Sequence, residues 1–276
     1  MNRPLRTALA ALASVFGGLL VGCSSLPDRH NVQVGATPIA YSLTGPASAT
    51  PIVVLQSGLG DGMGPWAALV ERLSPELRVF AYDRPGYGDS GGLPSAARSP
   101  CVIATELRET LRGAGLAPPY LLVGHSIGGQ YQFAFARLFP GEVAGLLLLD
   151  PTHPDHWPQM QRRAAGVAAM VSGLRAAAFT PAMRAEFDAQ GSCLEAPRRL
   201  ADGIPTRVLA RTRYALTETD DFKAMAHELE QDWLRILPGS TLRRVEDASH
   251  YIHKDQPAEV ARELRAMVKE AQAQRR

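Results

Sequence analysis

Ser126 stands in a spacing that could support nucleophilic catalysis, because glycine lies two residues away on either side, at Gly124 and Gly128. A serine in the pattern Gly-x-Ser-x-Gly can occupy a sharp strand-to-helix turn, where neighbouring backbones pass so closely that bulkier residues would clash. The apolar run 121–123 precedes the motif, and a helical pattern follows it. This context predicts that Ser126 is a nucleophile and that the N–H of Ile127 can bind a developing oxyanion.

His250 is the histidine best placed to act as a base. It follows the predicted strand 241–245 in a loop, and the last predicted helix, 258–273, begins beyond Pro257. An imidazole in such a loop can take the proton of a serine hydroxyl and return it to a leaving group. We therefore assign His250 as the general base and expect its neighbour His253 to be structural.

The carboxylate that would orient His250 has two candidate positions. Asp150 directly follows the apolar run 146–149, at the rim where open α/β sheets bind their ligands. Asp220 and Asp221 come after a later predicted strand, where they could instead begin a helix, since acidic residues suit the positive end of the helix dipole. Asp150 is the preferred third member of the triad, and the pair Asp220/Asp221 is the alternative.

The elements that would position these residues alternate along the chain. Five apolar segments read as buried strands, and most are separated by helical patterns: 52–55, 78–82, 121–123, 146–149 and 206–210. This order predicts an α/β fold with a mostly parallel central sheet and helices on both faces. Two short extended segments around Gly35 predict a hairpin at one edge of that sheet.

The strand at 52–55 runs into a loop with glycine at alternate positions, namely Gly58, Gly60 and Gly62. Glycine permits the positive φ angles and the close approach that a loop with exposed backbone needs. A phosphate-binding loop is the rival interpretation, but the Gly-Lys-Ser/Thr ending is missing. We therefore expect an inner strand that ends in a loop with exposed backbone groups.

From about Ile52 to the C-terminus the chain resembles the α/β-hydrolase superfamily, in the branch of single-domain esterases and lipases. The resemblance rests on four motifs: Ser57-Gly58-Leu59-Gly60, Asp83-Arg84-Pro85-Gly86-Tyr87-Gly88, Gly124-His125-Ser126-Ile127-Gly128 and Ser249-His250. It implies an α/β-hydrolase fold in which the N–H of Leu59 joins that of Ile127 in an oxyanion hole. The family usually begins the first motif with histidine, where this chain has Ser57. Most members carry the acid after the seventh strand, and those with it after the sixth match Asp150.

A segment at about 153–203 interrupts the alternation of strands and helices, and the resemblance implies a helical lid there. Its large apolar side chains favour ordinary packing, with an acyl pocket as the alternative; they are Trp157, Met160, Met170, Phe179 and Phe187. His153, Asp155 and His156 suggest a metal site, but Pro154 interrupts them and no other ligand cluster exists. We expect no metal and no cofactor.

The N-terminal residues are expected to be a targeting segment. Arg3 and Arg6 precede an apolar stretch that ends in Leu20-Val21-Gly22-Cys23, which resembles a bacterial lipobox with Cys23 as the lipidated residue. We expect a signal peptide at 1–22, a tether at 23–31 and the hydrolase domain at 32–276. The protein would be lipid-anchored in the bacterial cell envelope, facing the periplasm, with the outer membrane favoured over the inner one.

Composition supports one domain without a nucleic-acid partner. The chain has 276 residues, 46% of them hydrophobic, and a formal net charge of +2 with lysines and arginines scattered among acidic residues. Besides Cys23, only Cys101 and Cys193 remain, and they could form a disulfide or stay as two thiols. A small-molecule ester is the expected substrate, and the oligomeric state is not determined by the sequence.

The function expected from these residues is a serine hydrolase that cleaves carboxylic esters through an acyl-enzyme intermediate. An acyltransferase with the same triad and a catalytically inactive envelope-binding lipoprotein are the alternatives. Epoxide hydrolase and dehalogenase chemistry would need a carboxylate where this chain has Ser126.

Overall fold

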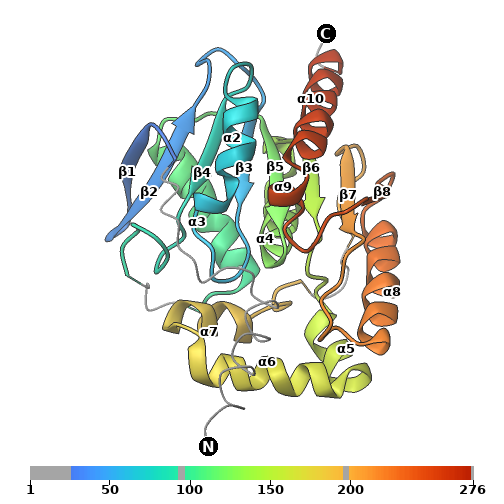
Figure 1. Cartoon of the computed structure of the whole chain (residues 1–276). Helices are drawn as coiled ribbons and strands as arrows, with labels where there is room; N and C mark the ends of the chain where they lie inside the picture. Colours follow the sequence, from blue (N-terminus) through green and yellow to red (C-terminus); the bar gives the residue numbers. More distant parts are fainter. Residues whose placement is uncertain (1–25, 93–96, 195–198, 275–276) are drawn as a thin grey trace, which may run out of the picture.

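The computed structural model describes residues 26–92, 97–194 and 199–274, which are organised around one sheet (Figure 1). Eight strands lie in the order β1-β2-β4-β3-β5-β6-β7-β8. Their bounds are β1 (Arg29–Val34), β2 (Thr37–Thr44), β3 (Ile52–Gln56), β4 (Val79–Tyr82), β5 (Tyr120–His125), β6 (Val143–Leu149), β7 (Thr206–Arg211) and β8 (Thr241–Val245). Strand β2 pairs antiparallel with both β1 and β4, whereas the strands from β4 to β8 are parallel. The predicted edge hairpin and mostly parallel sheet are confirmed.

Helices cover both faces of the sheet, as Figure 1 shows. One face carries α2 (Ala67–Leu73), α9 (Ile252–Asp255) and α10 (Pro257–Ala273), and the other carries α3 (Pro100–Gly113), α4 (Ile127–Leu138) and α8 (Asp220–Ile236). Two short 3₁₀ helices, η1 (Gly64–Trp66) and η2 (Pro140–Glu142), complete the body. Every residue of β3 and β5 is buried, which explains their continuous apolar runs, because such strands meet side chains on both faces.

Three helices between β6 and β7 lie beyond the carboxyl ends of the parallel strands, at the bottom of Figure 1. They are α5 (His156–Arg163), α6 (Ala165–Ala178) and α7 (Pro181–Asp188), which we call the cap. The chain leaves the helical conformation at Ala164, which separates α5 from α6. Within the described ranges, no helix has both the length and the apolar character needed to cross a bilayer.

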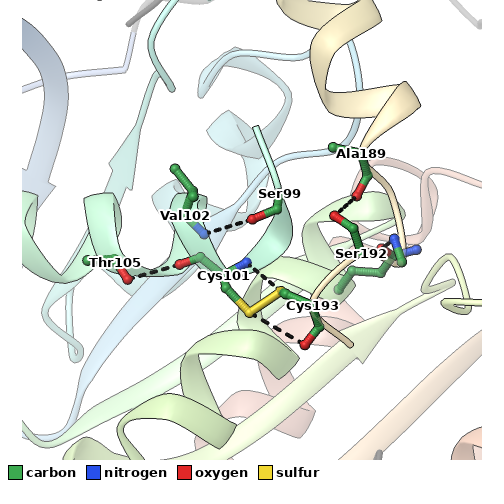
Figure 2. The surroundings of a disulfide bond; sticks show 9 residues. Ser99, Cys101, Val102, Thr105, Ala189, Ser192 and Cys193 are labelled. Carbon is green, nitrogen blue, oxygen red and sulfur yellow. Dashed lines mark hydrogen bonds between the residues drawn. A yellow bond between two sulfur atoms is a disulfide. The ribbon is translucent and has the colours of Figure 1, made fainter. Parts of the chain in front are cut away.

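A disulfide joins the body to the end of the cap. Cys101, in the first turn of α3, is bonded to Cys193, which lies just after α7 (Figure 2). The backbone around Cys101 is ordered by the side chain of Ser99, which accepts a hydrogen bond from the N–H of Val102 and caps α3. The chain segment that follows α7 is therefore covalently tied to the body.

Candidate active site

Ser126 occupies a strained turn between β5 and α4. Its backbone angles are φ 55° and ψ −127°, a region that side-chain-bearing residues rarely adopt. The two glycines of the motif are required by close backbone contacts. A Cβ atom on Gly124 would lie 2.5 Å from the carbonyl oxygen of Gly128, and one on Gly128 would lie 2.5 Å from that of Gln56. The turn thus presents the Ser126 side chain above the carboxyl end of β5.

The side chain of Thr152 is the hydrogen-bond partner of the Ser126 hydroxyl among the described residues. The two oxygen atoms, Ser126 Oγ and Thr152 Oγ1, are 3.3 Å apart. The N–H of Thr152 also donates to the carbonyl oxygen of Ser126 at 3.0 Å. Sequence reasoning missed Thr152, because nothing in the local pattern distinguishes this hydroxyl from that of any other loop threonine.

His250 and Asp150 meet although they are 100 positions apart. Nδ1 of His250 lies 2.6 Å from Oδ2 of Asp150. Because an ionised carboxylate only accepts hydrogen bonds, Nδ1 carries the proton and Nε2 is left as the basic nitrogen. The structure thus brings Asp150 to the imidazole, whereas Asp220 and Asp221 form the exposed first turn of α8.

Arg211 provides a second contact to Asp150 that sequence reasoning missed. Its Nε lies 3.3 Å from Oδ2 of Asp150, and its Nη2 donates to Glu218 at 2.7 Å. Burial alone would raise the pKa of Asp150, but the charge of Arg211 and the hydrogen bond from His250 outweigh it and lower the pKa to about 2. Asp150 is therefore ionised throughout the neutral range.

His125 holds the backbone of His250 in place through a hydrogen bond. Nε2 of His125 lies 2.8 Å from the carbonyl oxygen of His250 and donates to it. Burial, together with the charge of His250, lowers the pKa of His125 to about 3, so this imidazole is neutral. On its other side His125 packs against His253, which stacks on Trp66 with ring centroids 4.1 Å apart. The burial and stacking of His253 agree with the expected structural role.

Ser57, which stands where the resemblance led us to expect histidine, holds the loop after β3 by two hydrogen bonds. Oγ of Ser57 accepts a hydrogen bond from Nε1 of Trp66 and donates to the carbonyl oxygen of Gly62, both at 2.8 Å. The Ser57 side chain thus links the start of the loop to Gly62 and to Trp66. The N–H of Ile127, as the first residue of α4, has no carbonyl partner inside its helix.

A cavity of about 430 Å³ opens between the sheet and the cap. The five residues predicted for the site all line it; they are Ser126, His250, Asp150, Leu59 and Ile127. Large apolar side chains from the cap and α8 form much of its remaining wall: Trp157, Met160, Phe187, Phe222 and Leu229. Met170 and Phe179, in contrast, pack against neighbouring apolar side chains of the cap and do not line the cavity.

The residues that could together hold a metal ion in the structure differ from the three that the sequence suggested. Candidate ligand atoms of His153, Asp155 and Asp232 lie within 4.8 Å of one another, and His156 is not among them. Nε2 of His153 lies 2.8 Å from a carboxylate oxygen of Asp232, and Nδ1 accepts a hydrogen bond from the N–H of Asp155 at 3.1 Å. Both ring nitrogens of His153 therefore contact groups of the protein itself. Cys23, the predicted lipidation site, lies outside the described residues.

Sequence comparison matches residues 52–263 to the alpha/beta hydrolase family. The chain belongs to that family. The uncharacterized protein YqjL of Bacillus subtilis is 27% identical over 217 residues, covering 74% of this chain and 78% of that protein. A putative lipase from Acinetobacter baumannii has a similar structure, with a TM-score of 0.67, 17% identity and coverage of 99% of this chain and 98% of the other. A thermophilic esterase from Thermogutta terrifontis gives a TM-score of 0.59, 22% identity and coverage of 88% and 98%. The predicted α/β-hydrolase fold is confirmed.

Proposed function

We propose that this member of the alpha/beta hydrolase family is a serine hydrolase that cleaves carboxylic esters through an acyl-enzyme intermediate. The observation that carries the proposal is the 2.6 Å contact between His250 and Asp150, in the cavity that also contains Ser126. The ionised carboxylate fixes the imidazole tautomer and stabilises the imidazolium that forms during the reaction. The neighbours described as a lipase and an esterase agree with this class of reaction.

Acylation would begin when Oγ of Ser126 attacks the ester carbonyl carbon and Nε2 of His250 accepts the hydroxyl proton. For this step the Ser126 hydroxyl turns from Thr152 toward His250 by rotation about its Cα–Cβ bond. Such a change agrees with the general finding that catalytic hydrogen bonds in unliganded enzymes are often poorly aligned until substrate binds. The backbone N–H groups of Leu59 and Ile127 stabilise the oxyanion. His250 then gives its proton to the leaving alcohol, and water releases the acyl group by the same steps.

The apolar wall of the cavity supports an ester with an apolar acyl or alcohol part. Trp157 and Met160 of α5 and Phe187 of α7 contribute rings and a thioether, which remove apolar substrate surface from water. Hydrolysis rates for 4-nitrophenyl esters from acetate to palmitate measure how long a chain this wall accommodates. We expect the highest kcat/KM for a chain of intermediate length, because the apolar wall favours a chain longer than acetate while a volume of about 430 Å³ limits how long it can be.

The triad is tested with two variants and one matched control. Ser126→Ala should lose both ester turnover and labelling by a fluorophosphonate probe. Asp150→Asn should lower kcat by about 10⁴-fold, since the imidazole loses its oriented tautomer. Asp221→Asn, which removes an exposed carboxylate on α8, is the control and should leave kcat unchanged. Labelling of Ser126→Ala, or full activity of Asp150→Asn, would refute the assignment.

We also propose that Cys23 is lipidated and holds the domain at the bacterial cell envelope. The lipobox-like sequence supports this proposal, and the disulfide between Cys101 and Cys193 is of the kind that persists in oxidising compartments. Incorporation of an alkyne-labelled fatty acid by the native host protein, and its loss in Cys23→Ala, is the test. Labelling that survives in Cys23→Ala would refute it.

A further inference from the structure

A cluster of buried charges connects α7 with the loop that would hold the oxyanion. Glu186 of α7 has 0% of its side chain exposed, and Arg84 has 1%. The two form a bidentate pair, with Nε and Nη2 of Arg84 each 3.0 Å from a carboxylate oxygen. Tyr87 and Tyr131 add hydroxyl groups that donate to Glu186 at 2.8 and 3.2 Å, and Arg98 contacts it at 3.3 Å. Both carboxylate oxygens of Glu186 are therefore paired inside the protein.

Arg84 uses its remaining donors on the backbone of the loop. Nη1 donates to the carbonyl oxygen of Ser57 and Nη2 to that of Gly58, both at 2.8 Å. The carbonyl of Gly58 and the N–H of Leu59 belong to one planar trans peptide unit, so they point in opposite directions. When Arg84 fixes the direction of the Gly58 carbonyl, it therefore also fixes the direction of the Leu59 N–H.

Glu186 controls whether Arg84 can keep this geometry. A buried guanidinium that loses its carboxylate partner is strongly destabilised and tends to move toward water or another acceptor. Helix α7 in turn has a fixed place. Met183 contacts the loop, since a Cβ on Gly60 would lie 3.3 Å from its Cε, and the disulfide at Cys193 ties down the chain just beyond the helix (Figure 2).

We propose that Glu186 and Arg84 are positioning residues that aim the N–H of Leu59 at the oxyanion, so that α7 is a fixed part of the catalytic machinery and not a moving lid. This inference rests on the proposed ester hydrolysis. It assigns the cap two roles, because α7 orients a backbone donor while α5, packed against α6, lines the cavity.

The test compares two carboxylates of the same helix. Glu186→Gln keeps the size of the side chain but removes its charge, and Asp188→Asn removes an exposed carboxylate that pairs with Arg175 on α6. If the Leu59 N–H loses its direction, kcat of Glu186→Gln falls by about 100-fold, as when one oxyanion donor is removed. We expect KM to change little, and a trifluoromethyl ketone that forms a tetrahedral adduct with serine to bind more weakly by a similar factor. Asp188→Asn should match the wild type in all three measurements.

Arg84→Lys keeps the positive charge beside Glu186 but cannot reach both carbonyl oxygens, so it tests the same step if Glu186→Gln does not fold. A folded Glu186→Gln or Arg84→Lys with wild-type kcat would overturn the proposal, as would a loss confined to KM. Failure of the proposed function is distinct, because the wild-type protein would then neither turn over esters nor react with fluorophosphonate.

Discussion

Helix α7 and the pair α5 and α6 belong to the same segment between β6 and β7, yet they rest on the body of the protein through different contacts. α7 is held by the buried pair Arg84–Glu186 and by the nearby disulfide at Cys193. α5 and α6 pack on α8 through an apolar cluster made up of Met160, Ala164, Val167, Ala168, Phe222, Met225 and Leu229.

The difference matters because the two kinds of contact constrain the chain differently. Hydrogen-bonded charges fix direction as well as distance, which a backbone donor in an active site requires. Apolar packing is non-directional and tolerates small shifts, which suits a wall that adapts to different substrates. We therefore expect changes in the charged contacts of α7 to act mainly on kcat, and changes in the apolar cluster under α5 and α6 to act mainly on KM.

Removal of the disulfide is expected to have the largest effect on stability. In Cys101→Ser/Cys193→Ser the crosslink across a sequence separation of 92 is lost, which by loop entropy lowers the free energy of unfolding by about 4.6 kcal/mol. Urea unfolding of the double variant, compared with the oxidised wild type, measures this change. Equal midpoints with equal slopes would mean that the covalent link does not hold α7 in place.

Truncation of the apolar contact to α5 and α6 should have the next largest effect. Met225 of α8 is fully buried in the cluster under these helices, and Met225→Ala should lower the free energy of unfolding by about 3 kcal/mol. Since this side chain does not line the cavity, kcat should stay near the wild-type value while KM for long-chain esters rises. A loss in kcat equal to that of Glu186→Gln would erase the distinction between the two halves of the cap.

As pH falls, the contacts of α5 should weaken at a higher pH than the contacts of α7. Burial, together with the charge of Arg211, lowers the pKa of His156 to about 4 from the ordinary 6.5. For Glu186, burial would raise the pKa, but the charge of Arg84 outweighs it and lowers the pKa, so this carboxylate stays charged.

As pH falls, the unfolded chain binds a proton at His156 at a higher pH than the folded protein does. The neutral His156 therefore contributes stability that is complete above pH 6.5 and is lost as pH falls toward 4. Between pH 7 and pH 5 the loss should be about 2 kcal/mol. His156→Gln is the comparison, because the buried His125 and His253 titrate in both proteins. Identical pH dependence of unfolding in the two would contradict the assignment.

Much of the fold could be predicted from the sequence, since the buried strands β3 and β5 are short apolar runs that end in glycine-rich loops. The elbow at Ser126 was equally readable, because Gly124 and Gly128 leave a steric signature in the sequence itself. The cap was read less well. The break falls at Ala164, while the nearest glycine, Gly166, lies inside α6, so the sequence does not mark the division between α5 and α6 at its own position.

The partners of the candidate site depended on distances that a sequence does not contain. Loops after β6 and β7 end at the same edge of the sheet, so either could have brought an acid to His250. Arg211 could have been suspected, as a cation at the end of β7, because the strand ends at the same edge of the sheet as Asp150. Glu186 could not, since it meets Arg84 across 102 positions from the middle of a short helix with no distinguishing pattern.

An exposed ion pair in the α5 half provides the smallest expected effect and the sharpest contrast with Glu186. Arg163, the last residue of α5, pairs with Glu228 of α8, whose side chain is 64% exposed. Water and salt screen such a pair, so Glu228→Gln should not change the Tm or kcat measurably. Each of the two Glu→Gln changes takes the negative charge from an ion pair that joins the cap to the body. The two pairs differ chiefly in burial. If Glu228→Gln lowered kcat as Glu186→Gln is expected to, then loosening of the cap as a whole, and not the aim of one backbone N–H, would govern catalysis.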